Sequence, residues 1–173
     1  MSKQEAHIEE LVQQLAARLS DKGWMLATAE SCTGGMIAAA CTDLAGSSQW
    51  FERGFVTYSN EAKTEMLGVP AELIARHGAV SEEVVRAMAE GALRHSRAQV
   101  SIAVTGVAGP SGGSAEKPVG TVWVGWAVQN AIHSQLLQLS GSRSSIRLAT
   151  TRRSVEHLLS AITPPAPHCA QCN

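Results

Sequence analysis

A nearly continuous apolar run, Val100 to Thr105, places the strongest constraint on how this chain folds. Successive side chains of a strand point to opposite faces of the sheet, so a strand without alternation is covered on both faces. The run ends in a segment too rich in glycine for regular structure, Gly106 to Gly113. We therefore expect a buried central strand that leads into an irregular loop.

The rest of the chain alternates between strand-like and helix-like segments. Apolar residues at helical spacing predict an N-terminal helix that stops at Gly23, a helix that starts from the glycines before Met36, and a closing helix to Ile162. A short helix around 63–67, capped by Asn60, and a longer one opened by Ser81 lie between them. The predicted strands are 24–29, 55–58, 119–128 and 132–139, the last two forming a hairpin. This alternation favours a layered α/β domain with a mostly parallel sheet and an antiparallel pair late in the chain.

The composition limits the possible functions. The 173 residues carry 14 Lys and Arg against 15 Asp and Glu, so no basic excess favours nucleic acid as a partner. No apolar run approaches the roughly 20 residues of a membrane span, and the polar start lacks the apolar core of a signal peptide. We expect a cytoplasmic protein without a membrane partner, with one domain over residues 1–163 and a disordered tail over 164–173.

The segment ATAESCTGG, residues 27–35, points most directly to chemistry. Ser31 follows a predicted strand and precedes two glycines and a helix, a turn that exposes a hydroxyl beside backbone N–H groups. Those groups suit attack on a carbonyl and stabilisation of the resulting oxyanion. Ser and Thr are also common helix N-caps, so the spacing alone leaves a purely structural interpretation open.

A base for Ser31 is sought in the loops after the other strands, because the ends of parallel strands converge on one crevice. These loops contain no His, which argues against a Ser-His-Asp arrangement. Lys63 lies near a predicted helix start, where the helix dipole and burial lower a lysine pKa and favour a neutral amine. Tyr58, at the preceding strand end, could relay a proton. A solvated lysine and an interfacial tyrosine are the alternative.

Two further segments suit an anion. The glycines from Gly106 to Gly113 let backbone N–H groups approach a phosphate closely, or they make a sharp connection and nothing more. The loop has neither a Walker motif nor a dinucleotide fingerprint. Arg143 lies in a hydroxyl-rich segment that begins the last helix, which suits a phosphate site or a plain helix cap with a surface arginine.

The four cysteines are too unevenly spaced for a disulfide framework. Cys32 is a rival nucleophile to Ser31, although we expect its side chain to pack inward. Cys41 belongs to an apolar helix face and is expected in the core. In the tail, His168, Cys169 and Cys172 supply three ligands where a structural zinc site takes four, so we expect no metal.

Taken together, these segments resemble a known family. The chain is similar to the C-terminal domain family of the competence/damage-inducible protein CinA, and most of all to its stand-alone members, the nicotinamide-nucleotide amidohydrolases. The resemblance spans roughly residues 28 to 160 and includes the helix of Arg143. Its segments are TAESCTGG (28–35), GSSQWFERGFVTYSNEAK (46–63), MLGV (66–69), HGAVSEEVVRAMAEGA (77–92), SIAVTGVAGPSGGS (101–114) and KPVGTVWVGW (117–126).

The resemblance implies a three-layer α/β/α sandwich with a mixed, mostly parallel sheet. It implies an amidohydrolase that converts nicotinamide mononucleotide to nicotinate mononucleotide and ammonia, in pyridine nucleotide salvage. Carried over by motif, Ser31 is the nucleophile, Lys63 the general base and Tyr58 its partner. No cofactor is expected, and a homo-oligomer is expected from the habit of the family and from four tryptophans that need burial.

The resemblance also implies a set of substrate-binding residues. Backbone N–H groups near Thr33 to Gly35 would hold the oxyanion, and Arg143 would meet the phosphate. Ser111 stands where the family is expected to favour Asp, which leaves the contact of that loop open. The implied set is Thr33, Gly34, Gly35, Thr105, Gly106, Gly109 and Arg143.

Two alternatives from other functional classes remain open at this point. The first is a non-catalytic nucleotide-binding regulatory module, which the intact Ser31, Tyr58 and Lys63 disfavour. The second is a serine amidase for another small amide, which a dependence of turnover on the substrate phosphate would distinguish.

Overall fold

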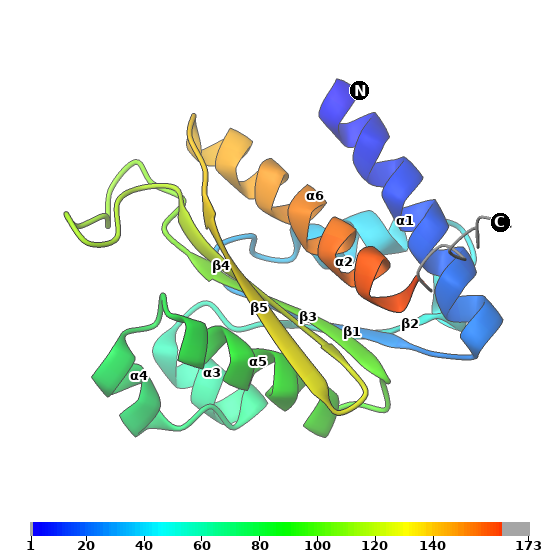
Figure 1. Ribbon diagram of the computed structural model, residues 1–173, viewed down its shortest axis with the longest axis horizontal. Coiled ribbons are helices and arrows are strands. Elements are labelled where there is room, and N and C mark those ends of the chain that lie inside the picture. Colours follow the sequence, from blue (N-terminus) through cyan, green and yellow to red (C-terminus); the bar gives the residue numbers. More distant parts are fainter. Residues whose placement is uncertain (1, 164–173) are drawn as a thin grey trace, which may run out of the picture.

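The computed structural model describes residues 2–163, and the expectations for the tail lie outside them. These residues form a three-layer α/β/α sandwich, in which a mixed sheet of five strands has helices on both faces (Figure 1), as the sequence predicts. None of the helices within residues 2–163 is long and apolar enough to cross a membrane.

The sheet has the strand order β2-β1-β3-β4-β5. The strands are β1 (Leu26–Glu30), β2 (Phe51–Val56), β3 (Val100–Gly106), β4 (Thr121–Val128) and β5 (Ala131–Gln138). β1 pairs in parallel with β2 and β3, whereas β4 pairs antiparallel with β3 and β5. Four strands therefore run in one direction and β4 in the other, which agrees with the mostly parallel sheet and the late hairpin that the sequence predicts.

Three helices cover one face: α1 (Lys3–Lys22), α2 (Met36–Thr42) and α6 (Arg143–Ile162). α1 starts with a capping box between Ser2 and Glu5 and ends at Gly23, whose φ of 62° is the left-handed conformation that glycine adopts most easily. Its buried stripe, which includes Leu15 and Leu19, packs in one core cluster with α6 and the sheet.

The opposite face is covered by α3 (Asn60–Leu67), α4 (Ala71–His77) and α5 (Glu82–Arg94). Ser81 caps α5 as predicted, and its hydroxyl accepts a hydrogen bond from the Val84 N–H. The strongly amphipathic α5 packs directly on the central strand β3 and on its neighbour β4. It approaches Gly125 of β4 so closely that a Cβ there would lie 2.9 Å from the carbonyl oxygen of Val85.

Two local predictions about element boundaries were wrong, and two short elements were not predicted. β2 covers Phe51–Val56 instead of 55–58, so Tyr58 lies in the connection after the strand. The cap of α3 is Ser59, whose hydroxyl accepts from the Ala62 N–H, and Asn60 is the first helical residue. Neither α4 nor the short 3₁₀ helix Ser47–Gln49 was expected, since both are short and lack a clear apolar period.

Candidate active site

The ends of three neighbouring parallel strands meet at one small pocket. Ser31 directly follows β1, Tyr58 and Lys63 follow β2, and Gly106 ends β3. β1 lies between β2 and β3, so Ser31 is flanked by the other two loops. The pocket has a volume of about 210 Å³. Its lining is Ser31, Cys32, Tyr58, Asn60, Lys63, Ala79, Val80, Thr105, Gly106, Ala108 and Arg143.

The Lys63 amine contacts the Ser31 hydroxyl. Lys63 Nζ lies 3.2 Å from Ser31 Oγ, and the lysine is only 1% exposed. The side chain folds back over the start of α3, where Nζ is within hydrogen-bond distance of the carbonyl oxygens of Thr57 (2.9 Å), Tyr58 (3.3 Å) and Ser59 (3.3 Å). These carbonyls hold the amine in place against the serine.

Burial lowers the pKa of the Lys63 amine below its ordinary value, and attraction to negative charge at Cys32 and at Glu61 opposes this shift. Among residues 2–163, no carboxylate forms an ion pair with this lysine. A neutral amine can donate two hydrogens to the carbonyls and accept the Ser31 proton with its lone pair. The surroundings of Lys63 therefore suit a general base.

The Tyr58 hydroxyl does not contact Lys63. Its side chain is exposed, and the hydroxyl accepts a hydrogen bond from Arg143 Nη2 at 3.1 Å, while the Tyr58 backbone carbonyl faces the lysine amine. Arg143 also donates to the Gly109 carbonyl at 2.8 Å. The expected proton relay through Tyr58 is thus not seen, and the tyrosine instead joins the arginine at the pocket mouth.

A buried carboxylate, for which the sequence pattern indicated no role, organises the turn after Ser31. Glu30, the last residue of β1, is 1% exposed and accepts hydrogen bonds from the backbone N–H groups of Gly35 (3.0 Å), Ile37 (3.0 Å) and Ala38 (2.8 Å). It also accepts from the Thr33 hydroxyl at 2.7 Å. Glu30 therefore caps α2, because a carboxylate satisfies the free N–H groups of a helix start.

This cap contradicts part of the expected oxyanion site. The Gly35 N–H is bonded to Glu30, the Gly34 N–H donates to the Ser31 carbonyl at 3.0 Å, and Thr33 is fully buried. The Gly34 and Gly35 N–H groups are therefore not free to bind a ligand, and none of the three residues lines the pocket. Within the described part of the chain, no oxygen accepts from the N–H groups of Cys32 and Thr33, and of these two residues only Cys32 lines the pocket, so the Cys32 N–H is the better candidate.

The other predicted binding residues divide into two groups. Thr105 and Gly106 line the pocket, and the Thr105 hydroxyl donates to the Ala79 carbonyl at 2.8 Å. Gly109 lies outside the lining but supplies the carbonyl that holds Arg143. A Cβ at Gly109 would lie 2.5 Å from Val119, so the loop packs too closely there for a side chain. Ser111 is exposed and makes no pocket contact.

The cysteines described by the structure are in the core. Cys41 is fully buried, and Cys32 is 6% exposed and belongs to the same apolar cluster, as the sequence predicts. Burial raises the pKa of the Cys32 thiol to about 11, so it is protonated at neutral pH and a poor nucleophile. Between residues 2 and 163, no group of three His, Cys, Asp or Glu side chains could hold a metal ion.

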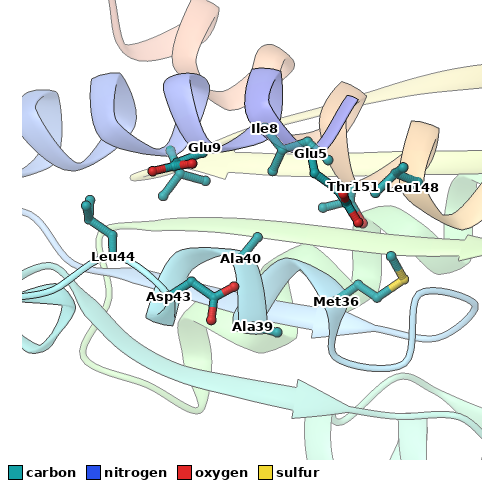
Figure 2. A pocket seen from close by; sticks show the side chains of 11 residues that line it. Glu5, Ile8, Glu9, Met36, Ala39, Ala40, Asp43, Leu44, Leu148 and Thr151 are labelled. Atoms are coloured by element: carbon teal, nitrogen blue, oxygen red, sulfur yellow. The ribbon is translucent and has the colours of Figure 1, made fainter. Parts of the chain in front are cut away.

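A second pocket, of about 460 Å³, lies between α1, α2 and α6 (Figure 2). Ile8 of α1 and Ala40 of α2 lie on opposite sides of it, and Glu9 and Asp43 also line it. This pocket is larger than the one at Ser31, but its lining contains no Ser, Cys, Lys or His that could act on a substrate. The smaller pocket at Ser31 is therefore the candidate active site.

The comparison with protein families agrees with this geometry. The model of the CinA C-terminal domain matches residues 8–162. The chain belongs to the CinA C-terminal domain family. The match covers every helix and strand except residues 3–7 at the start of α1, and it includes all the residues that line the Ser31 pocket.

Individual members of the family are similar over most of their length. The nicotinamide-nucleotide amidohydrolase PncC of Enterobacter agglomerans is 54% identical over 83% of this chain and 88% of that protein. The protein of the same name from Escherichia coli K12 is 48% identical over 89% of this chain and 94% of its own length. Among solved structures, the competence/damage inducible protein CihA from Agrobacterium tumefaciens superposes with a TM-score of 0.89 at 47% identity, over 91% of this chain and 96% of that one.

Proposed function

We propose that this chain is an amidohydrolase that deamidates nicotinamide mononucleotide, with Ser31 as nucleophile and Lys63 as general base. The observation that carries the proposal is the 3.2 Å contact between a buried lysine amine and a serine hydroxyl at the end of β1. The amidohydrolase names of the relatives that match nearly end to end support the choice of reaction and substrate. The reaction hydrolyses a linear amide C–N bond and belongs to pyridine nucleotide salvage.

The first half of the reaction forms an ester. Ser31 Oγ attacks the carboxamide carbon while its proton passes to neutral Lys63, and the carbonyl oxygen becomes an oxyanion held by the Cys32 N–H. When the tetrahedral intermediate collapses, the C–N bond breaks, and protonated Lys63 returns the proton to the leaving nitrogen, which departs as ammonia. The nicotinoyl group is left as an ester on Ser31.

The second half of the reaction releases the acid. A water molecule loses a proton to Lys63 and attacks the ester carbon, and collapse of the intermediate breaks the bond to Ser31 Oγ, which regains the proton from Lys63. The product is nicotinate mononucleotide, and the enzyme returns to its starting state. Apart from the water molecule, these two steps need no further reactant for atoms and charge to balance.

We assign substrate recognition to the pocket and its mouth. A volume of about 210 Å³ is below that of a typical pocket for a whole ligand, so we place the nicotinamide ring inside and the ribose phosphate outside. Arg143 is exposed at the mouth, and its hydrogen bonds go to the uncharged Tyr58 hydroxyl and Gly109 carbonyl, which leaves its charge available to a phosphate.

Turnover of two substrates tests this function against its alternatives. Wild-type protein should release ammonia from nicotinamide mononucleotide and much less from nicotinamide riboside, which lacks the phosphate. Equal turnover of both would favour a serine amidase for other small amides. Saturable binding of the mononucleotide without ammonia release would favour a nucleotide-binding regulatory module. The homo-oligomer, the cytoplasmic location and the absence of a nucleic acid partner stay predictions.

A further inference from the structure

Arg147 of α6 binds the turn that carries Ser31. Its Nε donates to the Cys32 carbonyl at 3.1 Å and its Nη2 donates to the Thr33 carbonyl at 2.7 Å. The fork of the guanidinium thus spans two consecutive peptide units directly after the nucleophile. The arginine is half-buried and is absent from the lining of the Ser31 pocket, so it acts on the turn from outside.

The arginines further along α6 make contacts of a different kind. Arg152 and Arg153 both donate to the carboxylate of Glu156 on their own helix. None of the ion pairs among residues 2–163 involves Arg147, and its side-chain donors go to backbone carbonyls more than 110 residues earlier in the chain. Its position is therefore hard to explain as support for α6 alone.

The hydrogen bonds of Arg147 determine how the turn presents its groups. The Ser31 carbonyl accepts from the Gly34 N–H, and the next two carbonyls accept from Arg147, so all three are bound to donors of residues that do not line the pocket. A carbonyl oxygen rotated into the pocket would repel an oxyanion. The Cys32 N–H is left without an acceptor in residues 2–163, as an oxyanion donor requires.

We infer that Arg147 is a positioning residue for the reaction: it holds the Ser31–Gly34 turn so that the Ser31 hydroxyl and the Cys32 N–H face the substrate together. It does so from one side, while Glu30 fixes the following N–H groups from the other. Arg147 touches neither the substrate nor Lys63. The inference rests on Ser31 being the nucleophile, as proposed above.

The test compares wild type with Arg147→Ala, Arg147→Lys and the matched control Arg152→Ala. One readout is steady-state ammonia release from nicotinamide mononucleotide. The second is independent of that substrate: the rate at which phenylmethylsulfonyl fluoride modifies Ser31, followed by intact mass. In that reaction Ser31 Oγ bonds to sulfur, fluoride leaves and the proton passes to Lys63. Melting temperature is recorded for each variant, and guanidinium ion is added below unfolding concentrations.

We expect Arg147→Ala to lower both kcat and the sulfonylation rate by about 10- to 100-fold, with KM changed less than about threefold. Guanidinium should restore part of both rates in Arg147→Ala only. The ammonium of Arg147→Lys cannot bind both carbonyls as a fork, so its rates should be intermediate. Arg152→Ala should match wild type.

Rates of Arg147→Ala within about twofold of wild type would overturn the inference. So would equal losses in the Ala and Lys variants without any response to guanidinium, which would indicate a structural role only. If Arg147→Ala does not fold, the Lys variant decides by the same two rates. A wild type that is sulfonylated at Ser31 but releases no ammonia would contradict the proposed function alone, because the sulfonylation rates still test Arg147. A wild type without either reaction would overturn both.

Discussion

Lys63 and Ser31 lie 32 positions apart in the chain, yet Lys63 Nζ is 3.2 Å from Ser31 Oγ. The contact exists because β1 and β2 are parallel neighbours, so the residues that follow them meet at the same edge of the sheet. The lysine is buried, and its other polar partners are three backbone carbonyls. The geometry couples the protonation of the amine to the reactivity of the hydroxyl.

Replacement of the lysine should separate binding from chemistry. We expect Lys63→Ala to lower kcat by about 10²- to 10⁴-fold, because the proton of Ser31 loses its acceptor. Nicotinamide mononucleotide should still bind with an affinity close to that of wild type, as measured by calorimetry. Lys22→Ala, an exposed substitution at the end of α1, serves as the control and should not change kcat. Lost binding with intact chemistry would instead identify Lys63 as a phosphate ligand.

The pH dependence of kcat/KM should follow the ionisation of Lys63. Only the neutral amine accepts the proton, so kcat/KM rises as pH rises through the lysine pKa. Because burial lowers that pKa, the rise should be centred below about 10.4, the value of an ordinary lysine. A profile from pH 5 to 10 in the free enzyme checks this. A flat profile, or one that falls over this range, would be inconsistent with a neutral lysine base.

Arg143 should act on the phosphate of the substrate. With nicotinamide mononucleotide, Arg143→Ala should raise KM by about 10- to 100-fold, and the difference from wild type should shrink at high salt. With nicotinamide riboside the same substitution should change KM little, because no phosphate is present. Kinetics with both substrates provide the internal control. An equal effect on the two substrates would mean that Arg143 acts through Tyr58 and the Gly109 loop instead.

Glu30 should contribute strongly to stability. Glu30→Gln removes the charge and turns one acceptor into a donor, so buried N–H groups at the start of α2 lose their partner. We expect the free energy of unfolding to fall by about 2 to 4 kcal/mol in urea titrations. The control is Glu90→Gln, which removes only an exposed ion pair with Arg94 and should cost about 0.5 kcal/mol or less. Equal effects of the two substitutions would disprove the capping role.

The sequence was sufficient to predict the layers of the fold and to predict that the loops after the parallel strands lie together. The apolar run Val100–Thr105 predicted a buried central strand, and β3 is central and covered on both faces. The proximity of Ser31, Lys63 and Thr105 follows from strand order and direction, which the alternating pattern indicates. These features depend on whole helices and strands, which the spacing of apolar residues in the sequence identifies.

The directions of individual side chains could not be predicted from the sequence. Tyr58 turns its hydroxyl to Arg143 because the backbone of 57–59 points its carbonyls at Lys63, a local choice that no pattern encodes. The role of Glu30 was missed because it caps α2 from the end of a strand, more than three residues before the helix starts. The role of Arg147 was missed because its hydrogen-bond partners are backbone carbonyls of the Ser31 turn. Only the packing of α6 against that turn brings them within reach of the guanidinium.

Ammonia release from nicotinamide mononucleotide by Ser31→Ala and Cys32→Ala tests the account most directly. The two residues are adjacent, so each variant controls for the disturbance that the other causes in the turn. We predict that Ser31→Ala loses at least about 10³-fold in kcat, while Cys32→Ala stays within about threefold of wild type. Turnover by Ser31→Ala at the rate of wild type, or its loss in Cys32→Ala alone, would contradict the assignment of Ser31 as the nucleophile.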